Sequence, residues 1–382
     1  MSDALDNSCA SSEYLRERAR RRVPRFAFEY LDGGCFSEVN LARNTEELRQ
    51  VELRPRYLLD YGGSSLQTEL FGHTYDAPFG VAPVGLQGLI WPGACEALAR
   101  AAQAHNVPFI LSTVGTASIE TVARLTEGRA WFQLYHPAED GLRDKLLERA
   151  RAAGLSVLVV LADTPTFAYR PKEMRNGLCL PPRMSARNVC QMLAHPTWSL
   201  GQLRAGAPRF ATIDPYLTKG HGLRHMSEFM DRHFSGRLSP QRLATLRDLW
   251  PGKLVVKGIV TEEDAELALD HGADGLLVSN HGGRNLDAGE STIRPLARLA
   301  EKYAQRTTLM FDSGLRSGSD IACAMAHGAH FTFLGRTFMY GAAALGNKGG
   351  AHTMAMLTKQ LTQVLEQLGC SRPSDLAAHL AQ

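Results

Sequence analysis

Residues 278–287 read VSNHGGRNLD, so that two glycines separate a histidine from an arginine directly after an apolar segment. An imidazole gains or loses a proton near neutral pH, and a guanidinium binds a carboxylate or a phosphate through parallel hydrogen bonds. His281 and Arg284 together therefore indicate proton transfer on an anionic compound. Two more segments, FDSGLRSGSD at 311–320 and FLGR at 333–336, also run from apolar residues into glycine and charged residues.

The elements that must hold these residues are short apolar runs. Eight such runs, rich in β-branched residues, recur from residue 79 onward, and a turn and a helix-like segment follow each one. Runs of this kind fit strands that are buried on both faces of a parallel sheet. Eight strand-and-helix units predict an α/β fold with a closed (β/α)8 TIM barrel, since a doubly wound sheet usually has about six strands. The expected strands are 79–83, 108–113, 130–135, 156–163, 253–259, 274–280, 307–314 and 330–336.

Two regions do not follow this repeat. Residues 1–78 precede the first expected strand and contain the basic, helix-like stretch YLRERARRRVPRFAFEYLDGG, which predicts an N-terminal helical extension. Residues 171–252, after the fourth strand, are far more than one connection needs, and segments of that length are usually lids or binding segments. We expect residues 1–382 to form a single domain with this extension and this insertion.

The expected strands end in polar side chains at the carboxyl end, where barrels of this class place their functional sites. Five cations there face only the two carboxylates of Asp163 and Asp312, so we expect anions to bind. A phosphate is expected at Arg316 and Arg336, because glycine and a helix N-terminus accompany arginine there. A substrate carboxylate is expected at Arg170 and Arg284. The five cations are Arg170, Lys257, Arg284, Arg316 and Arg336.

Proton chemistry at this end requires a partner for the histidine. Asp163 is the candidate, because a carboxylate orients an imidazole and stabilises its protonated form. Tyr135 could donate a hydrogen bond to a developing oxyanion. Each residue alone also has a structural interpretation, since a lone arginine often forms a surface ion pair and Gln133 or Tyr135 could fill a core layer. Because they share one end of one predicted barrel, we interpret them as a site for a small organic acid beside a phosphorylated cofactor.

Composition restricts the class of protein. The chain has 382 residues, a formal net charge of +3 and seven cysteines without a C-x-x-C pair. This charge is too small to predict nucleic-acid binding, and separate thiols fit a reducing cytoplasm. The N-terminus lacks an apolar signal-peptide core, and no segment approaches about eighteen uncharged apolar residues, so we expect neither secretion nor a membrane span. No metal site is expected.

Six motifs carry a family resemblance. In order and spacing, FEYLDGG, WFQLY, VKGI, VSNHGGRNLD, FDSGLRSGSD and FLGRTFMYG resemble the FMN-dependent L-2-hydroxy acid dehydrogenases and oxidases. The resemblance extends from about Tyr14 to Cys370. Within that family, APVGLQGLIWPG and AHPTWSL are most similar to the membrane-associated bacterial lactate and mandelate dehydrogenases. The resemblance implies FMN-dependent oxidation of an L-2-hydroxy acid, lactate- or mandelate-like, to the 2-oxo acid.

The resemblance also implies residue roles. The implied catalytic residues are the base His281, its partner Asp163 and Tyr135. The implied substrate-binding residues are Tyr30, Gly85, Tyr135, Arg170 and Arg284. The implied FMN-binding residues are Ala82, Pro83, Val84, Ser112, Gln133, Lys257, Ser279, Asp312, Arg316, Gly335 and Arg336. Whether the base removes the hydroxyl proton or the α-proton is left open.

Four positions depart from the family pattern. Leu161 stands where a threonine commonly lies near the flavin, and Asn285 stands where glutamine is usual. His136 follows LY where valine is common, and is either a second ionisable group at the barrel mouth or faces away from it. Gly85 stands where other members carry a larger side chain, which predicts room for a bulkier substrate.

The insertion is basic. Between residues 175 and 233 it has three acidic and eight basic residues, and so a net charge of +5, beside Trp198, Phe210 and Tyr216. Such a segment suits docking on an anionic membrane surface, with quinone or another compound as electron acceptor; the alternative is an ordinary mobile lid. The expected location is the cytoplasm, peripheral on the inner face of the cytoplasmic membrane, and the resemblance implies a homotetramer. The basic residues are Arg175, Arg183, Arg187, Arg204, Arg209, Lys219, Arg224 and Arg232.

Other activities are compatible with parts of this pattern. An oxidase of the same family would pass electrons to oxygen and produce hydrogen peroxide. A different FMN barrel enzyme, such as the flavin-dependent isopentenyl diphosphate isomerase, would bind a pyrophosphate, and a silent barrel would only bind or scaffold. The joint presence of Tyr30, Tyr135, Asp163, His281 and Arg284 favours a hydroxy acid dehydrogenase.

Overall fold

The computed structural model describes residues 6–178, 183–217, 229, 233–234 and 237–381. Eight parallel strands lie at its centre, and each falls within one of the apolar runs that predicted it. The strands are β3 (Phe79–Val81), β4 (Ile110–Ser112), β5 (Trp131–Leu134), β6 (Val157–Leu161), β7 (Lys253–Ile259), β8 (Gly275–Val278), β9 (Thr308–Phe311) and β10 (Phe331–Leu334).

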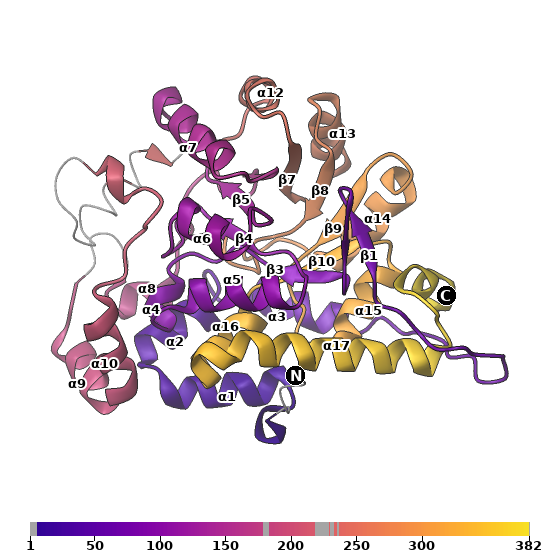
Figure 1. The fold of residues 1–382 in the computed structure, drawn as a ribbon, viewed down its shortest axis with the longest axis horizontal. Coiled ribbons are helices and arrows are strands. Elements are labelled where there is room, and N and C mark those ends of the chain that lie inside the picture. The colour runs from indigo at the N-terminus through magenta and orange to yellow at the C-terminus, as the bar shows by residue number, and fades with distance from the viewer. Residues whose placement is uncertain (1–5, 179–182, 218–228, 230–232, 235–236, 382) are drawn as a thin grey trace.

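These strands form a closed ring. They pair in the order β3, β10, β9, β8, β7, β6, β5, β4, and a bridge between Val81 of β3 and Phe109, just before β4, joins the two ends. Helices surround the strands (Figure 1). The predicted (β/α)8 barrel is therefore confirmed.

One or more helices follow each strand. The helices between strands are α4 (Gln87–Ile90), α5 (Ala94–Ala104), α6 (Ile119–Leu125), α7 (Asp140–Ala152), α8 (Pro171–Arg175), α9 (Ala186–Ala194), α10 (Pro196–Ala205), α12 (Pro240–Leu249), α13 (Glu262–Asp270), α14 (Ile293–Tyr303) and α15 (Gly318–Ala326). After β10 come α16 (Arg336–Leu345) and α17 (Gly349–Leu368). The 3-10 helices are η1 (Asn7–Cys9), η2 (Asp214–Tyr216), η3 (Gly346–Lys348) and η4 (Pro373–His379).

Local polar motifs start several of these helices. The side chain of Thr261 accepts the backbone N–H of Asp264 at the start of α13, and Ser317 and Asp320 form a reciprocal capping box at the start of α15. Capping fixes where a helix begins, because it satisfies backbone donors that lack a partner within the helix. The starts of these helices are therefore defined, and the side chains of the loops before them meet at one end of the barrel.

Large side chains fill the barrel interior, and a hairpin closes its amino end. The hairpin consists of β1 (Thr68–Leu70) and β2 (His73–Tyr75). Its Phe71 packs on Trp131 at the start of β5, and its Tyr75 packs on Phe331 at the start of β10, with ring centroids 5.7 and 5.6 Å apart. These strands were not predicted, since residues 1–78 were expected to be a helical extension. With the amino end closed, the carboxyl end is left for a site.

The N-terminal extension also has three helices, which reach the carboxyl end of the barrel, and a non-helical segment over residues 49–67. It contains α1 (Ser12–Arg22), α2 (Arg25–Asp32) and α3 (Val39–Leu48). α1 packs on α16, where the Arg22 guanidinium donates to the carbonyl oxygen of Ala344. α3 packs on α14 and α15, so the extension lies beside the loops that follow the last strands.

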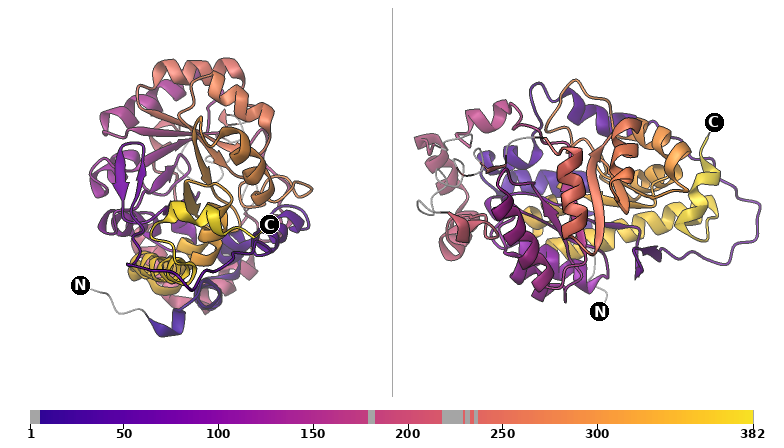
Figure 2. Two further views of the ribbon diagram at one scale, coloured as in Figure 1. Left: turned by 90° about the vertical axis from the view of Figure 1, so that its right-hand side faces the viewer. Right: turned by 90° about the horizontal axis from the view of Figure 1, so that it is seen from above.

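The region between β6 and β7 combines an insertion with one ordinary barrel helix. α12 directly precedes β7 and packs on α13, so the insertion proper is shorter than the predicted range of 171–252. The indole N–H of Trp198 in α10 donates to the carbonyl oxygens of Leu89 and Ile90, which fixes α10 to the barrel. α9 and α10 project at the end of the molecule opposite the C-terminus (Figures 1 and 2). Within the described ranges, no helix is long and apolar enough to cross a bilayer.

Candidate active site

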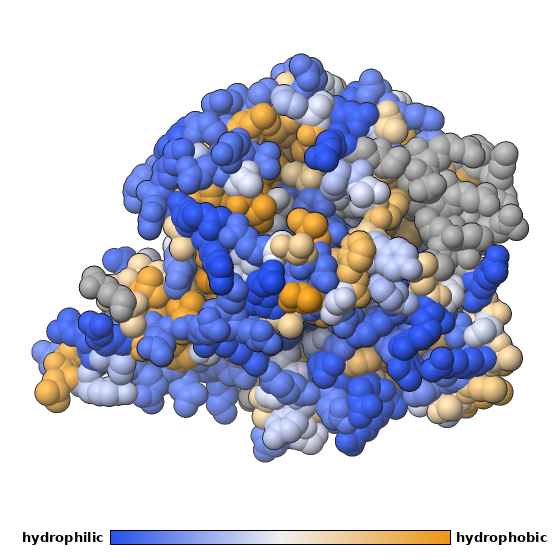
Figure 3. Space-filling view, turned by 180° about the vertical axis from the view of Figure 1, so that it is seen from behind, coloured by the Kyte–Doolittle hydropathy of each residue, from blue (hydrophilic) through white to orange (hydrophobic). Residues whose placement is uncertain are grey.

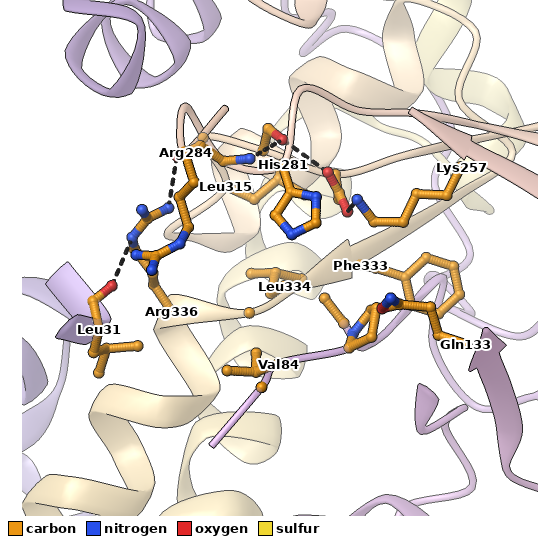
Figure 4. A pocket seen from close by; sticks show the side chains of 18 of the residues that line it. Leu31, Val84, Gln133, Lys257, His281, Arg284, Leu315, Phe333, Leu334 and Arg336 are labelled. Carbon is orange, nitrogen blue, oxygen red and sulfur yellow. Dashed lines mark hydrogen bonds and ion pairs between the residues drawn. The ribbon is translucent and has the colours of Figure 1, made fainter. Parts of the chain in front are cut away.

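A cavity opens at the carboxyl ends of the strands (Figure 4). Its wall brings together residues predicted from the sequence to form one site. Figure 4 shows His281 and Lys257 on one side of the cavity, Val84 and Gln133 on the other, and Arg284 and Arg336 toward one end. The predicted residues on the wall are Tyr30, Ala82, Pro83, Val84, Gly85, Gln133, Tyr135, Arg170, Lys257, His281, Arg284, Asp312, Arg316, Gly335 and Arg336.

His281 and Asp163 form the predicted pair. The Nδ1 atom of His281 lies 3.0 Å from Oδ1 of Asp163, and its Nε2 atom lies 3.5 Å from the hydroxyl oxygen of Tyr135. Since a carboxylate only accepts hydrogen bonds, Nδ1 must carry the proton of this contact. Nε2 of the neutral ring is therefore left with a lone pair on the side of Tyr135, and can take up a proton.

The protonation states suit a base and a hydrogen-bond donor. Burial lowers the pKa of His281 below the ordinary value, although Asp163 partly opposes this. Burial alone would raise the pKa of Asp163, but the charges of His281 and Lys257 outweigh it and lower the pKa to about 2. Burial raises the pKa of Tyr135. Near neutral pH the carboxylate is thus charged, the imidazole is mainly neutral and the phenol keeps its proton.

Lys257 is a buried cation, with an exposed fraction of 3%. Its ammonium lies 3.2 Å from Asp312 and 3.7 Å from Asp163, and it donates to the hydroxyl of Ser279 over 2.6 Å. Burial alone would lower the pKa of Lys257, but the two carboxylates raise it. The ammonium therefore stays charged beside the cavity, and its attraction to the two carboxylates offsets the cost of burying it.

Arg170 and Arg284 lie next to each other on the cavity wall, and we call this part of the wall the substrate end. The Nε atom of Arg170 donates to the backbone carbonyl of Arg284 over 3.2 Å. The Arg284 guanidinium lies over the ring of Tyr30 at 5.3 Å and donates to the carbonyl oxygens of Tyr30 and Gly33. Burial, followed by the charge of Arg170, lowers the pKa of Arg284. Two partly buried guanidiniums at this spacing favour the binding of an anion.

Arg336 is a second place where an anion is favoured. Its guanidinium donates to the carbonyl oxygens of Leu31, Gly33 and Gly282, none of which carries a charge. Burial, followed by the charge of Arg316, lowers the pKa of Arg336 to about 9. A partly buried cation whose hydrogen bonds, among the described residues, go to carbonyl groups and which lies near a second cation is well suited to a phosphate.

The cavity that these arginines border fits FMN. The side-chain amide nitrogen of Gln133 is buried and donates to no acceptor in the described part of the chain, so it offers a hydrogen bond to a ring acceptor of a ligand. Ala82, Pro83 and Val84 form an apolar part of the wall, and Figure 4 shows Val84 on the side opposite Lys257. A flat ring system would lie between the apolar wall and Lys257, with its phosphate near Arg316 and Arg336.

Three predicted site residues are not on the cavity wall. Asp163 acts through its contacts with His281 and Lys257, as described above. Ser279 accepts from Lys257 and from the backbone N–H of His281, and so supports both. Ser112 is buried and accepts the N–H of Val114, away from the wall.

The four positions that depart from the family pattern lie in different surroundings. Neither Leu161 nor His136 lines the cavity, and burial lowers the pKa of His136 to about 4, with Arg242 and Arg143 adding to the shift. His136 therefore faces away from the mouth and is neutral near pH 7. The side-chain amide of Asn285 donates to the carbonyl oxygen of Asp163 over 2.6 Å. The space opened by Gly85 is partly filled, because a Cβ there would lie 2.9 Å from a methyl of Val114.

The two glycines of VSNHGGRNLD pack against other parts of the protein and do not mainly make room for substrate. A Cβ on Gly282 would lie 2.5 Å from the Arg336 guanidinium, and one on Gly283 would lie 2.5 Å from the backbone nitrogen of Leu41 in α3. Their φ angles of 66° and 71° also favour glycine. Both glycines thus allow the histidine loop to contact the phosphate-end arginine and the N-terminal extension.

Other wall residues were not singled out by the sequence. Ser313 accepts the N–H of Gly282 and donates to Asp312, and it directly follows Asp312 in the motif DSG, which could have identified it. Leu31 follows the predicted Tyr30. Val114 and Leu315 line the cavity as apolar residues that no motif marks. Glu173 contacts both substrate-end arginines, and nothing in its local sequence distinguishes it from a surface acid.

Comparison with known proteins agrees with this geometry. The family model for FMN-dependent dehydrogenase matches residues 19–382. The chain is 37% identical to an L-lactate dehydrogenase of Acinetobacter baylyi over 368 residues, 96% of each chain. Its structure is similar to that of the monotopic membrane protein (S)-mandelate dehydrogenase, with a TM-score of 0.93, 35% identity and coverage of 98% of this chain and 100% of the other. A mandelate oxidase structure has a TM-score of 0.82 at 30% identity, with 96% of each chain covered. The chain belongs to the FMN-dependent dehydrogenase family.

Proposed function

We propose that this chain oxidises an L-2-hydroxy acid, lactate- or mandelate-like, to the corresponding 2-oxo acid. The observation that carries the proposal is the His281–Asp163 pair, with Nδ1 and Oδ1 3.0 Å apart, at the same cavity as Arg170 and Arg284. A base beside a pair of guanidiniums suits a substrate whose hydroxyl and carboxylate are on adjacent carbons. The L-lactate and mandelate dehydrogenase relatives support the same substrate class.

Bound FMN supplies the redox chemistry, because it accepts two electrons. Ala82, Pro83, Val84 and Gln133 would hold its ring, and Lys257 would place a positive charge beside it. Arg316, Gly335 and Arg336 would hold its phosphate, and Asp312 would hold the ribityl chain. All nine residues line the cavity: Ala82, Pro83, Val84, Gln133, Lys257, Asp312, Arg316, Gly335 and Arg336.

The protein side chains handle the substrate and its protons. Arg170 and Arg284 bind and orient the carboxylate through charge-assisted hydrogen bonds. Nε2 of His281 takes a proton from the substrate, and Asp163 stabilises the imidazolium that results. The Tyr135 hydroxyl donates to the substrate oxygen as that oxygen becomes a carbonyl. Tyr30, on the same wall, excludes water from the guanidinium pair.

Anaerobic mixing of the yellow FMN-loaded protein with L-2-hydroxy acids tests the proposal. L-lactate or L-mandelate should bleach the flavin absorption, and one 2-oxo acid should form per flavin. The D-enantiomers serve as the control and should leave the absorption unchanged. If none of a broad set of L-2-hydroxy acids reduces the flavin, the proposed function is wrong.

The electron acceptor is part of the proposal. We infer a quinone or another acceptor rather than oxygen, since the curated relative with 37% identity is a dehydrogenase. The oxidase alternative is retained because a mandelate oxidase has the same fold at a TM-score of 0.82. Admitting air to the reduced protein separates the two, because an oxidase reoxidises quickly and produces hydrogen peroxide. A quinone analogue should restore the absorption faster than air does.

We also propose that the protein docks on an anionic membrane surface. α9 and α10 expose Leu193, Leu200 and Leu203 to 76%, 53% and 80%, and exposed Arg187 and Arg204 lie on the same helices. Figure 3 shows apolar and hydrophilic residues side by side at the lower right, where α9 and α10 lie in that view. Exposed leucines beside arginines suit the boundary between headgroups and acyl chains. The relative of known structure named as monotopic supports this reading.

Part of the basic segment lies outside the described residues, namely Lys219, Arg224 and Arg232. The described helices are therefore the testable part of the surface. Sedimentation with anionic vesicles should show binding that weakens as salt is raised. Binding that is absent at low salt would exclude membrane docking while leaving the hydroxy acid activity in place. We also propose that the chain forms a homotetramer, and light scattering measures the molar mass that tests this.

A further inference from the structure

Glu173 is a carboxylate at the substrate end that the proposed reaction has not used. Its Oε1 atom lies 2.6 Å from Nη2 of Arg284 and 3.4 Å from Nη1 of Arg170. The Glu173 side chain is 14% exposed, and those of Arg284 and Arg170 are 15% and 18% exposed. One oxygen atom therefore contacts both guanidiniums in a site with little access to water.

The short helix that carries Glu173 is fixed on both sides by the N-terminal extension. Lys172 donates to Glu38 over 2.6 Å, and Asn176 donates to Glu29 over 2.7 Å. Arg175 also pairs with Glu29 at 2.9 Å. Glu173 thus reaches the arginines from an element whose position other contacts determine.

The same contacts fix how the guanidiniums are turned. Nη1 of Arg284 donates to two backbone carbonyls at 2.8 Å, and Nη2 donates to Glu173. Nε of Arg170 donates to the carbonyl of Arg284 and its Nη2 to Asn285. Most donors are thereby committed to the protein, and the remaining N–H groups are the ones available to a ligand.

We propose that Glu173 is a positioning and charge-setting residue, which holds Arg170 and Arg284 in place and leaves the substrate end with one net positive charge. This inference rests on the proposed function. The nearby Arg336, which donates to the same Gly33 carbonyl as Arg284, is assigned to the cofactor phosphate. The remaining two guanidiniums and one carboxylate sum to a single positive charge, which one substrate carboxylate neutralises. A second carboxylate on the ligand would meet no free cation there and would be repelled by Glu173. The site is therefore selective for 2-hydroxy monocarboxylates over compounds with a second acidic group.

Oxamate and oxalate provide a matched pair of probes, because they have nearly the same shape and differ by one negative charge near neutral pH. Neither has an α-hydrogen, so the FMN-loaded protein binds them without turnover, and flavin absorption reports the Kd. Glu173→Gln keeps an oxygen that accepts from the guanidiniums but removes the charge. It should shift the ratio of Kd values in favour of oxalate by about tenfold, the change that one nearby charge produces at a partly buried site.

Two variants separate charge from structure. Glu173→Asp keeps the charge and should retain the wild-type ratio. Glu38 pairs with Lys172 of the same helix and contacts neither arginine. Glu38→Gln therefore removes a charge near the helix and should change both Kd values alike. If Glu173→Gln gives no folded, FMN-containing protein, Glu173→Ala is measured in its place with the same expectation.

An unchanged ratio of the two Kd values in Glu173→Gln would overturn the inference. A shift of this ratio in Glu38→Gln as large as that in Glu173→Gln would overturn it as well. These outcomes leave the proposed function intact if wild-type flavin is still reduced by an L-2-hydroxy acid. If wild-type protein binds neither anion and no hydroxy acid reduces its flavin, both the proposed function and this inference fail.

Discussion

His281 adopts a left-handed backbone conformation, with a φ angle of 59°. A residue other than glycine rarely takes this conformation, which costs about 1–2 kcal/mol. Three contacts hold it: Ser279 accepts the N–H of His281, Ser313 accepts that of Gly282, and the side chain of Asn280 accepts that of Gly283. The turn directs the imidazole toward Asp163, so the strain serves to place the base.

The pH dependence of the reaction follows from this pair. A base must be unprotonated, so kcat/KM should rise with pH through the His281 pKa, which burial places below 6.5, and then level off. Asp163 raises that pKa, and therefore Asp163→Asn should move the rise to lower pH. The same variant should lower the plateau by about 100-fold or more, because the imidazolium loses its partner. Profiles from about pH 5 to about pH 9 measure both effects. A rise that moves to higher pH would contradict this assignment.

Arg336 should act on the cofactor phosphate. Arg336→Met removes a partly buried cation that donates to three carbonyl groups, and the FMN Kd should rise by about tenfold or more. Riboflavin, which lacks the phosphate, is the control ligand, and its Kd should change by less than about threefold. Flavin fluorescence measures both constants. Equal losses for the two ligands would show that Arg336 supports the fold rather than the phosphate.

At the scale of elements, α3 supports the loop that carries the base. The side-chain amides of Asn44 and Asn280 exchange hydrogen bonds at 2.9 and 2.7 Å, and Asp287 accepts the N–H groups of Ser37 and Asn40. The extension therefore contacts both ends of the loop 280–287. Its role is to hold the loop in a conformation that the loop would not keep alone.

Removing one amide of this pair should separate stability from cofactor binding. Asn44→Ala removes both hydrogen bonds between Asn44 and Asn280 and should destabilise the protein by about 2 kcal/mol. Flavin reduction should slow, while FMN remains bound because Asn44 does not line the cavity. Thermal unfolding and stopped-flow reduction measure the two effects. Glu46→Ala, at an exposed position of α3, is the control and should change stability by less than about 0.5 kcal/mol. Equal effects of the two substitutions would remove α3 from this role.

Several elements could be predicted from the sequence because one physical signal determines each. Strands buried on both faces require continuous apolar runs, and all eight strands lie in such runs. Barrel topology then brings the residues after each strand together, which is why Lys257, His281 and Arg336 could be assigned to one cavity without knowledge of any distance.

Other features depend on contacts between distant segments. β1 and β2 have three residues each, too few for a periodic signal, and they are defined by packing of Phe71 and Tyr75 on the barrel interior. Glu173 reaches Arg284 because α8 is fixed by Glu29 and Glu38, more than a hundred residues earlier in the chain. The packing of Gly282 on Arg336 is likewise invisible in a local pattern.

At the scale of the whole molecule, the barrel closes at its amino end with a hairpin and opens at its carboxyl end into the cavity. α9 and α10 extend to one end of the molecule, while the loop that contains Leu58 lies at the other (Figures 1 and 2). Because α8, α9 and α10 come from one insertion, the chain that contacts the substrate-end arginines continues directly into the proposed membrane surface.

Acidic substitutions test that surface. Leu193→Glu combined with Leu203→Glu places two charges where the exposed fractions are 76% and 80%, and vesicle binding should fall by about tenfold or more. Activity with a soluble acceptor should persist, because neither residue lines the cavity. Leu58→Glu, at a fully exposed leucine of the opposite end, is the matched control and should bind vesicles like the wild type. Equal binding by all three proteins would exclude α9 and α10 as the docking surface.

The central claim is that His281, paired with Asp163, is the base of an FMN-dependent oxidation of an L-2-hydroxy acid. The most direct measurement is the anaerobic single-turnover rate of flavin reduction by L-lactate and L-mandelate in the wild type and in His281→Gln, with FMN content matched. We predict that the wild type bleaches with at least one of these acids, and that His281→Gln keeps its FMN but reduces about 100-fold to 10,000-fold more slowly. Equal rates in the two proteins would contradict the account.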